Sequence, residues 1–395
     1  MPKKLVLTCL VNFLIAALMG LALRYTYISP IPLNYRFLTH AHSHVAMLGW
    51  VYLMLYVFIV QYFVPNKKPI YHKLFWFTEL TVIGMMLSFP FTGYAVLSII
   101  FSTLHIFCSY YFARLIWKNH KTESKASSYL LKLSLIFMVI STIGTWCLGP
   151  AGSMFGQGSA FFQISIQFFL HFQFNGWFLI AALTILFHKL KIKDSTEFKR
   201  FFNLLVVSTI LTLALPVNWF LPHSSLLWIN GLGILLQITS LYLFIKLIKK
   251  PYQLLINNSP KISKHLLHFS ILCFILKTGL QTISIIPEIS NTIFQHKNLV
   301  IGFIHLTMLG VISGFLLSYI LQSKLVTQNR FLTSGLHIFI LGFILTEVII
   351  IAQGCLFYFG KGLLPNYYML LFLSSILLPL GVLSLIYNIY KTKTT

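Results

Sequence analysis

The chain has 395 residues, of which 57% are hydrophobic and only 9% are charged. A soluble domain carries roughly 25% charged residues, so this composition excludes an ordinary soluble protein and indicates a polytopic membrane protein. The formal charge of +23 would suit nucleic-acid binding in a soluble chain, but the basic residues lie mostly in short loops between apolar runs, so we expect no nucleic-acid partner.

Twelve apolar segments follow one another along the chain, and each is long enough to cross a bilayer, which takes roughly 20 residues. The first is longer than the apolar part of a signal peptide and has no clear cleavage site, so we interpret it as a span. The sequence therefore predicts an all-α bundle of about twelve transmembrane helices in one integral membrane domain, 1–395. The expected spans are 5–28, 37–63, 74–91, 93–117, 129–149, 158–188, 201–221, 225–248, 265–286, 298–322, 332–357 and 366–390.

The loops between these spans alternate between basic and nearly uncharged. Lysine and arginine concentrate in the cytoplasmic loops of membrane proteins, so the alternation assigns each loop to a side and places both termini in the cytoplasm. These features predict a multi-pass protein of the bacterial inner (cytoplasmic) membrane, with the lipid bilayer as its partner. The five cysteines are scattered without a C-x-x-C pair, which indicates neither a disulfide framework nor a thiolate metal site.

Three histidines at alternate positions, His40, His42 and His44, open the second span. Imidazole is costly in hydrocarbon, and its usual functions are binding a metal or haem and moving protons. His40 and His44 share a helical face, whereas His42 points roughly the other way. His305, in the tenth span, lies about as deep as His44, roughly 10 Å below the outer surface. The matched depth favours His44 and His305 as ligands of one iron, with His40 as the substitute for His44.

Two further histidines, His105 and His171, lie near the middle of the fourth and sixth spans. Together with His42 they are candidate ligands of a second metal, and imidazole suits copper, iron or zinc. The alternative for each is a hydrogen bond to a neighbouring helix, which the polar residues Gln173 and Asn175 near His171 would favour.

Few charged side chains fall within the spans or at their mouths. Arg36 stands directly before the histidine cluster, where a guanidinium suits either a haem propionate or a lipid headgroup. Glu79, Glu347 and Lys277 lie inside spans, and buried charges of this kind usually pair or carry protons. Glu347 and Lys277 both come near mid-membrane and are candidates for such a pair.

Short motifs surround the deep histidines. His305 precedes Gly310 by five residues, His171 precedes a Gly-Trp pair, and His44 lies in the second span. These features resemble the haem–copper oxidase superfamily, both subunit I of cytochrome oxidase and the nitric oxide reductase branch. That family has twelve spans, with haem-ligand histidines in spans two and ten and a metal ligand in span six. The resemblance implies haem b, a copper or iron second metal, and respiratory partner subunits or an electron donor such as a quinol or cytochrome c.

Two positions depart from the family pattern. The first histidine of the family's span-ten His-x-His is Phe303 here, and the adjacent histidines of span seven are missing, with His223 standing alone beyond that span. The resemblance therefore implies a low-spin haem site without the usual binuclear centre, and it assigns no catalytic residue.

Three functions follow as alternatives. The leading hypothesis is a haem-binding membrane protein with an electron-transfer or respiratory role, since two histidine ligands fill both axial positions of the iron; if it is an enzyme, it is an oxidoreductase. The second is a non-enzymatic protein that handles or senses copper, haem or nitric oxide. The third is a proton-coupled secondary transporter that uses Glu79, Glu347, Lys277 and the histidines as a proton relay.

Overall fold

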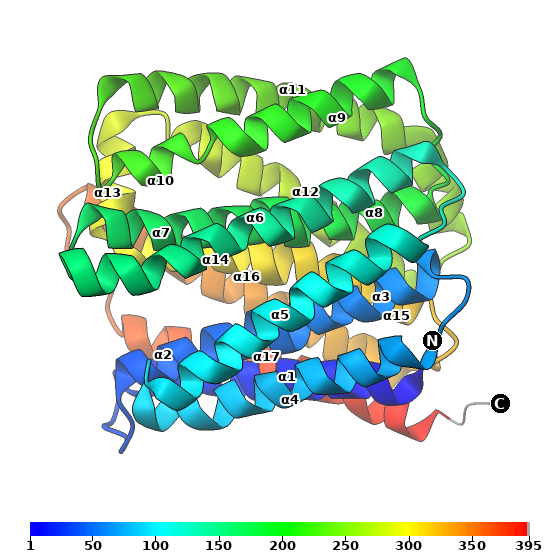
Figure 1. Ribbon diagram of the computed structural model, residues 1–395. Helices are drawn as coiled ribbons and strands as arrows, with labels where there is room; N and C mark the ends of the chain where they lie inside the picture. Colours follow the sequence, from blue (N-terminus) through cyan, green and yellow to red (C-terminus); the bar gives the residue numbers. More distant parts are fainter. Residues whose placement is uncertain (393–395) are drawn as a thin grey trace. The chain divides into compact units, whose positions relative to one another are not determined.

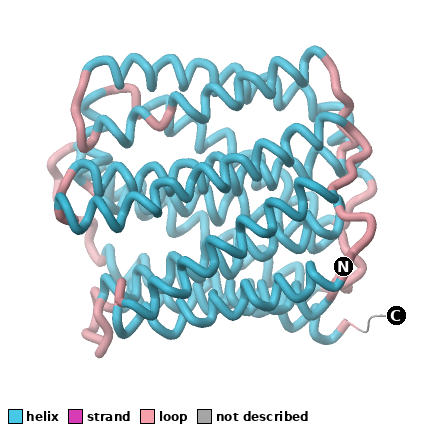
Figure 2. The backbone as a smooth tube through the Cα atoms, viewed as in Figure 1, coloured by secondary structure: helices cyan, strands magenta, loops and turns pink. Residues whose placement is uncertain are grey.

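A computed structural model describes residues 1–392, and all regular structure in that part of the chain is helical (Figures 1 and 2). Twelve helical spans are long and apolar enough to cross a membrane. Inside a bilayer every backbone polar group needs a partner within the protein, and a helix provides it within one segment. The prediction of an all-α chain with twelve candidate membrane spans is confirmed.

Nine of the twelve candidate spans are built from α-helices, whereas the second, sixth and tenth each combine two α-helices with a π-helix between them. The elements in chain order are α1 (Lys3–Tyr25), α2 (Tyr35–His44), η1 (Val45–Tyr52), α3 (Leu53–Phe63), α4 (Pro69–Thr92), α5 (Val96–Asn119), α6 (Lys125–Phe155), α7 (Ala160–His171), η2 (Phe172–Phe178), α8 (Leu179–Lys189), α9 (Thr196–Leu211), α10 (Ala214–Asn218), α11 (Ser224–Asn257), α12 (Lys261–Ile283), α13 (Pro287–Gln295), α14 (Lys297–His305), η3 (Leu306–Ser313), α15 (Gly314–Leu321), α16 (Arg330–Tyr358) and α17 (Tyr367–Lys391).

The contacts within the chain define two compact units. The single membrane domain expected from the sequence remains a prediction. Unit 1 comprises Met1–Phe112, Pro260–Ser270 and His296–Thr395, and unit 2 comprises Ala113–Ser259 and Ile271–Gln295.

Both ends of the described chain lie together in unit 1. The Lys3 ammonium donates hydrogen bonds to the carbonyl oxygens of Tyr390 (3.0 Å) and Thr392 (2.7 Å). The two ends are therefore on the same side, as an even number of spans requires. Their cytoplasmic location remains a prediction from the loop charges.

A polar N-terminal cap fixes the start of α2, the helix that carries His40, His42 and His44. The Asn34 side-chain oxygen accepts hydrogen bonds from the backbone N–H groups of Arg36 (2.9 Å) and Phe37 (3.2 Å). These are donors that the first turn of a helix leaves without partners, so Asn34 starts α2 at this point.

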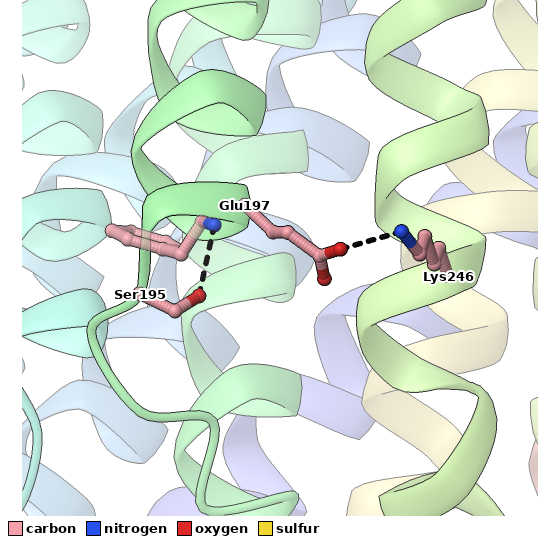
Figure 3. A network of polar contacts seen from close by, with 4 residues as sticks. Ser195, Glu197 and Lys246 are labelled. Carbon is pink, nitrogen blue, oxygen red and sulfur yellow. Dashed lines mark hydrogen bonds and ion pairs between the residues drawn. The ribbon is translucent and has the colours of Figure 1, made fainter.

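A similar cap starts α9 in unit 2, where Ser195 accepts a hydrogen bond from the Phe198 N–H at 3.1 Å. Beside it, Glu197 forms an ion pair with Lys246 of α11 at 2.5 Å (Figure 3). Both side chains of this pair are about half exposed, and ion pairs at such positions contribute little to stability.

Small residues bring α16 and α17 of unit 1 close together. A Cβ atom added to Gly381 would lie 2.8 Å from the Gly335 carbonyl oxygen, and one added to Gly342 would lie 3.2 Å from that of Ser374. Helices in a bilayer are held together by close packing and hydrogen bonds, because lipid tails remove the hydrophobic driving force between them. This contact is of that kind.

Candidate functional site

Three deep histidines each end an α-helix and directly precede a π-helix. His44 precedes η1, His171 precedes η2 and His305 precedes η3. π-Helical segments are rare and are frequently found at functional sites. Three of the six histidines named as candidates from the sequence therefore share a local backbone feature that His105, within α5, lacks.

One sequence signal marks all three segments. In each, a glycine follows the histidine by five positions, and the motifs fall in the second, sixth and tenth spans. The three motifs therefore recur at intervals of four spans. The sequence had indicated the five-residue spacing at His305 and the Gly-Trp pair after His171, but its recurrence at His44 was missed. The pairs are His44 and Gly49, His171 and Gly176, and His305 and Gly310.

One face of α1, in unit 1, carries a polar or small residue at every fourth position. The four residues are Asn12, Ala16, Gly20 and Arg24. Residues spaced by four lie above one another on a helix. This face was not recognised from the sequence, although Arg24 was visible as an arginine at the outer end of an apolar span, where a positive charge is uncommon.

His42 packs directly on this face of α1. Its Nδ1 lies 2.8 Å from the Ala16 carbonyl oxygen, and because a carbonyl only accepts, Nδ1 carries the proton. The lone pair of His42 is therefore on Nε2. A Cβ atom added to Gly20 would lie 2.9 Å from His42 Cε1, so glycine is what leaves room for the ring.

His305 belongs to the same cluster. Its electrostatic neighbours are Arg24 and His42, and no residue of the described chain forms a hydrogen bond with its ring. His305 thus has His42 as an electrostatic neighbour, whereas the sequence favoured His44 as its partner. The pairing of His44 with His305 remains a prediction.

Arg24 and Glu347 add opposite charges to this cluster. Arg24 donates hydrogen bonds to the Ser375 hydroxyl and to the Leu371 carbonyl oxygen (3.4 Å), and it interacts electrostatically with Glu347. The Glu347 Oε1 atom is buried and has no hydrogen-bond partner among the described residues. Arg24 is therefore the electrostatic partner of Glu347, a role that the sequence had suggested for Lys277.

His44 and His40 face the opposite way, toward α4 and the loop that follows it. The His44 ring stacks on Phe89 with centroids 4.4 Å apart, and the His40 ring contacts Tyr94 at 4.7 Å. His44 Nδ1 donates to the His40 carbonyl oxygen at 2.8 Å. The structure agrees with the predicted split, in which His40 and His44 share one face and His42 lies on the other.

His105 of α5 lies near His44. It is 4% exposed, its ring contacts that of Tyr52, and its Nε2 atom is buried without a hydrogen-bond partner among the described residues. Its electrostatic neighbour is His44. Unit 1 thus holds two histidine clusters, one with His42 and His305 and one with His40, His44 and His105.

Arg36, the other candidate for an anion, belongs to the second of these clusters. It interacts electrostatically with His40 and with Tyr94. Burial raises the pKa of Tyr94 to about 12, so its phenol is neutral at physiological pH beside these groups. Arg24, and not Arg36, is the guanidinium near His42 and His305.

His171 lies in unit 2 and has a different environment. Its Nε2 donates to the Thr209 carbonyl oxygen at 2.7 Å, and its electrostatic neighbour is Lys277. Gln173, next to it in η2, accepts a hydrogen bond from Ser141 at 2.9 Å. These contacts match the alternative of a hydrogen bond to a neighbouring helix.

Within residues 1–392, no group of three or more histidine, cysteine, aspartate or glutamate side chains is arranged to hold a metal ion. A second metal held by His171, His105 or His42 therefore remains a prediction without a ligand cluster to support it. A haem iron needs only two axial protein ligands, so this finding leaves a bis-histidine site open.

No known family model matches the chain, and no curated protein matches it.

Proposed function

We propose that unit 1 binds haem b between His42 and His305 and that the protein transfers electrons in a membrane. The proposal is supported by the electrostatic interaction of His305 with His42, which come from separate helices, and by the tautomer of His42, which leaves one nitrogen free to bind iron. The Ala16 carbonyl fixes the Nδ1 proton of His42 and leaves Nε2 as the ligand atom.

The residues around the pair fit a haem. Gly20 lets the His42 ring pack closely on α1, and Arg24 is the cation that would hold a propionate through charge-assisted hydrogen bonds. When bound with two histidine ligands, haem supplies one-electron chemistry with both axial positions filled. The protein's contribution is then to orient the two imidazoles and to place positive charge at the site.

The resemblance to oxidase subunit I supports this role, whereas Phe303 at the position of the catalytic haem ligand argues against reduction of oxygen or nitric oxide by the family's route. A quinol or a cytochrome c is the proposed electron donor, and the bacterial inner membrane is the proposed location.

An absorption spectrum of the purified protein tests the proposal. We expect a sharp reduced b-type band that is lost in His42→Ala and in His305→Ala and retained in His44→Ala. Loss in His44→Ala with retention in His42→Ala would instead identify the pair that the sequence favoured. A protein that contains metal but no porphyrin would favour a copper-handling role. A protein that contains neither metal nor porphyrin would favour a transporter.

A further inference from the structure

A small cavity lies inside unit 2, away from the histidine clusters of unit 1. Its volume is about 10 Å³, which admits one guest of the size of a water molecule. Five of the side chains that line it carry oxygen, and the others are apolar. The oxygen-bearing residues are Asn175, Thr209, Thr212, Gln237 and Ser240.

The oxygens around this cavity are mostly hydrogen-bond acceptors. Asn175 Oδ1 and Gln237 Oε1 are buried and have no hydrogen-bond partner among the described residues. The Thr209 hydroxyl donates its proton to the Leu205 carbonyl oxygen (2.7 Å), so its oxygen retains only lone pairs for the cavity.

The Thr212 hydroxyl likewise donates its proton to the Ser208 carbonyl oxygen at 2.8 Å, so its oxygen also retains only lone pairs for the cavity. The cavity therefore has two buried amide oxygens without a donor among the described residues and two hydroxyl oxygens that offer only lone pairs. A water molecule offers two protons, so it can serve at most two of these four oxygens.

We propose that this cavity is a binding site for a small monovalent cation of the size of Na⁺. A hard cation is coordinated by several oxygens at once and satisfies all of the acceptors together. The inference does not depend on haem binding, since every residue that lines the cavity belongs to unit 2.

Lys277 is the internal competitor of such a cation. It is 0% exposed, and its ammonium donates to Gln281 Oε1 at 2.7 Å. The same Gln281 oxygen accepts a hydrogen bond from Gln237 Nε2 at 3.1 Å, so one amide separates Lys277 from the cavity. Two positive charges this close in a membrane interior repel each other strongly.

The cation should therefore bind better when Lys277 gives up its proton. The other titratable group that faces Lys277 is His171, with which it interacts electrostatically. The residues that α9 and α11 contribute to the cavity wall, Thr209, Thr212, Gln237 and Ser240 among them, do not titrate. Cation affinity is expected to rise with pH and to be antagonised by protons.

Thermal unfolding of the purified full-length protein tests the site, with NaCl, KCl and choline chloride compared at equal ionic strength. We expect a saturable stabilisation by Na⁺, as for any ligand that binds only the folded state. In Gln237→Leu and Ser240→Ala the apparent Na⁺ affinity should fall on the order of tenfold. Thr239→Val, at an exposed position of the same helix, is the matched control and should leave it unchanged.

Lys277→Gln is the sharper variant, because it should raise Na⁺ affinity and abolish its dependence on pH. If Gln237→Leu does not fold, Ser240→Ala and Lys277→Gln decide the question. Equal stability in the three salts would overturn the proposal and indicate a cavity filled by water alone. A Na⁺ effect that Ser240→Ala and Lys277→Gln leave unchanged would overturn it as well.

Discussion

The Trp50 indole donates a hydrogen bond to the Ser313 hydroxyl at 2.8 Å and joins two π-helices of unit 1 that are far apart in the sequence. Trp50 belongs to η1 and Ser313 to η3, and Trp50 is 1% exposed. The Ser313 hydroxyl in turn donates a hydrogen bond to the Met308 carbonyl oxygen at 2.7 Å, so both side chains have their hydrogen-bond partners.

Replacing Ser313 by alanine should destabilise the protein by about 1–3 kcal/mol, because the Trp50 N–H is left buried without an acceptor. Equilibrium unfolding in detergent measures the loss. Trp50→Phe removes the indole N–H and with it the need for an acceptor. It should therefore lower the free energy of unfolding by less than Ser313→Ala does. Trp228→Phe, at a position 81% exposed, is the control and should have almost no effect. A Ser313→Ala variant as stable as the parent would contradict this role.

Gly20→Ala should displace the His42 ring, because the new Cβ would lie 2.9 Å from Cε1. Strain of this kind in a packed interior costs about 1–3 kcal/mol, and haem content should fall with it. The pyridine haemochrome assay and thermal unfolding report the two effects. Gly279→Ala is the matched control, since nothing lies within 4 Å of that position, and it should be neutral or slightly stabilising. Equal behaviour of the two variants would argue against the His42 packing described here.

Arg24→Gln should lower the reduction potential of the bound haem, because it removes a positive charge that favours the addition of an electron. At an effective dielectric constant near 20, a nearby unit charge changes such an energy by about 1–3 kcal/mol. A spectroscopic redox titration measures the change. Arg36→Gln should have the smaller effect, since Arg36 interacts with His40 and Tyr94. A larger shift in Arg36→Gln would place the haem beside the His40 and His44 cluster instead.

The sequence by itself determined the twelve spans and the opposite orientations of His42 and His44. Span number follows from length and hydropathy, because a segment in lipid must satisfy its own backbone hydrogen bonds. The orientations follow from 3.6 residues per turn, which sets the angle between side chains on one helix whatever surrounds it.

Only the tertiary structure decided what packs against each of these histidines. The sequence sets relative angles on a helix, but the rotation of the whole helix about its axis is set by what packs against it. Here His42 packs against Gly20 and the Ala16 carbonyl of α1. The other face of the helix, which carries His40 and His44, packs against Tyr94 and Phe89. From depth, the sequence favoured His44 as the partner of His305. Contacts between segments distant in the sequence determine that His42 packs on α1, the helix that carries Arg24.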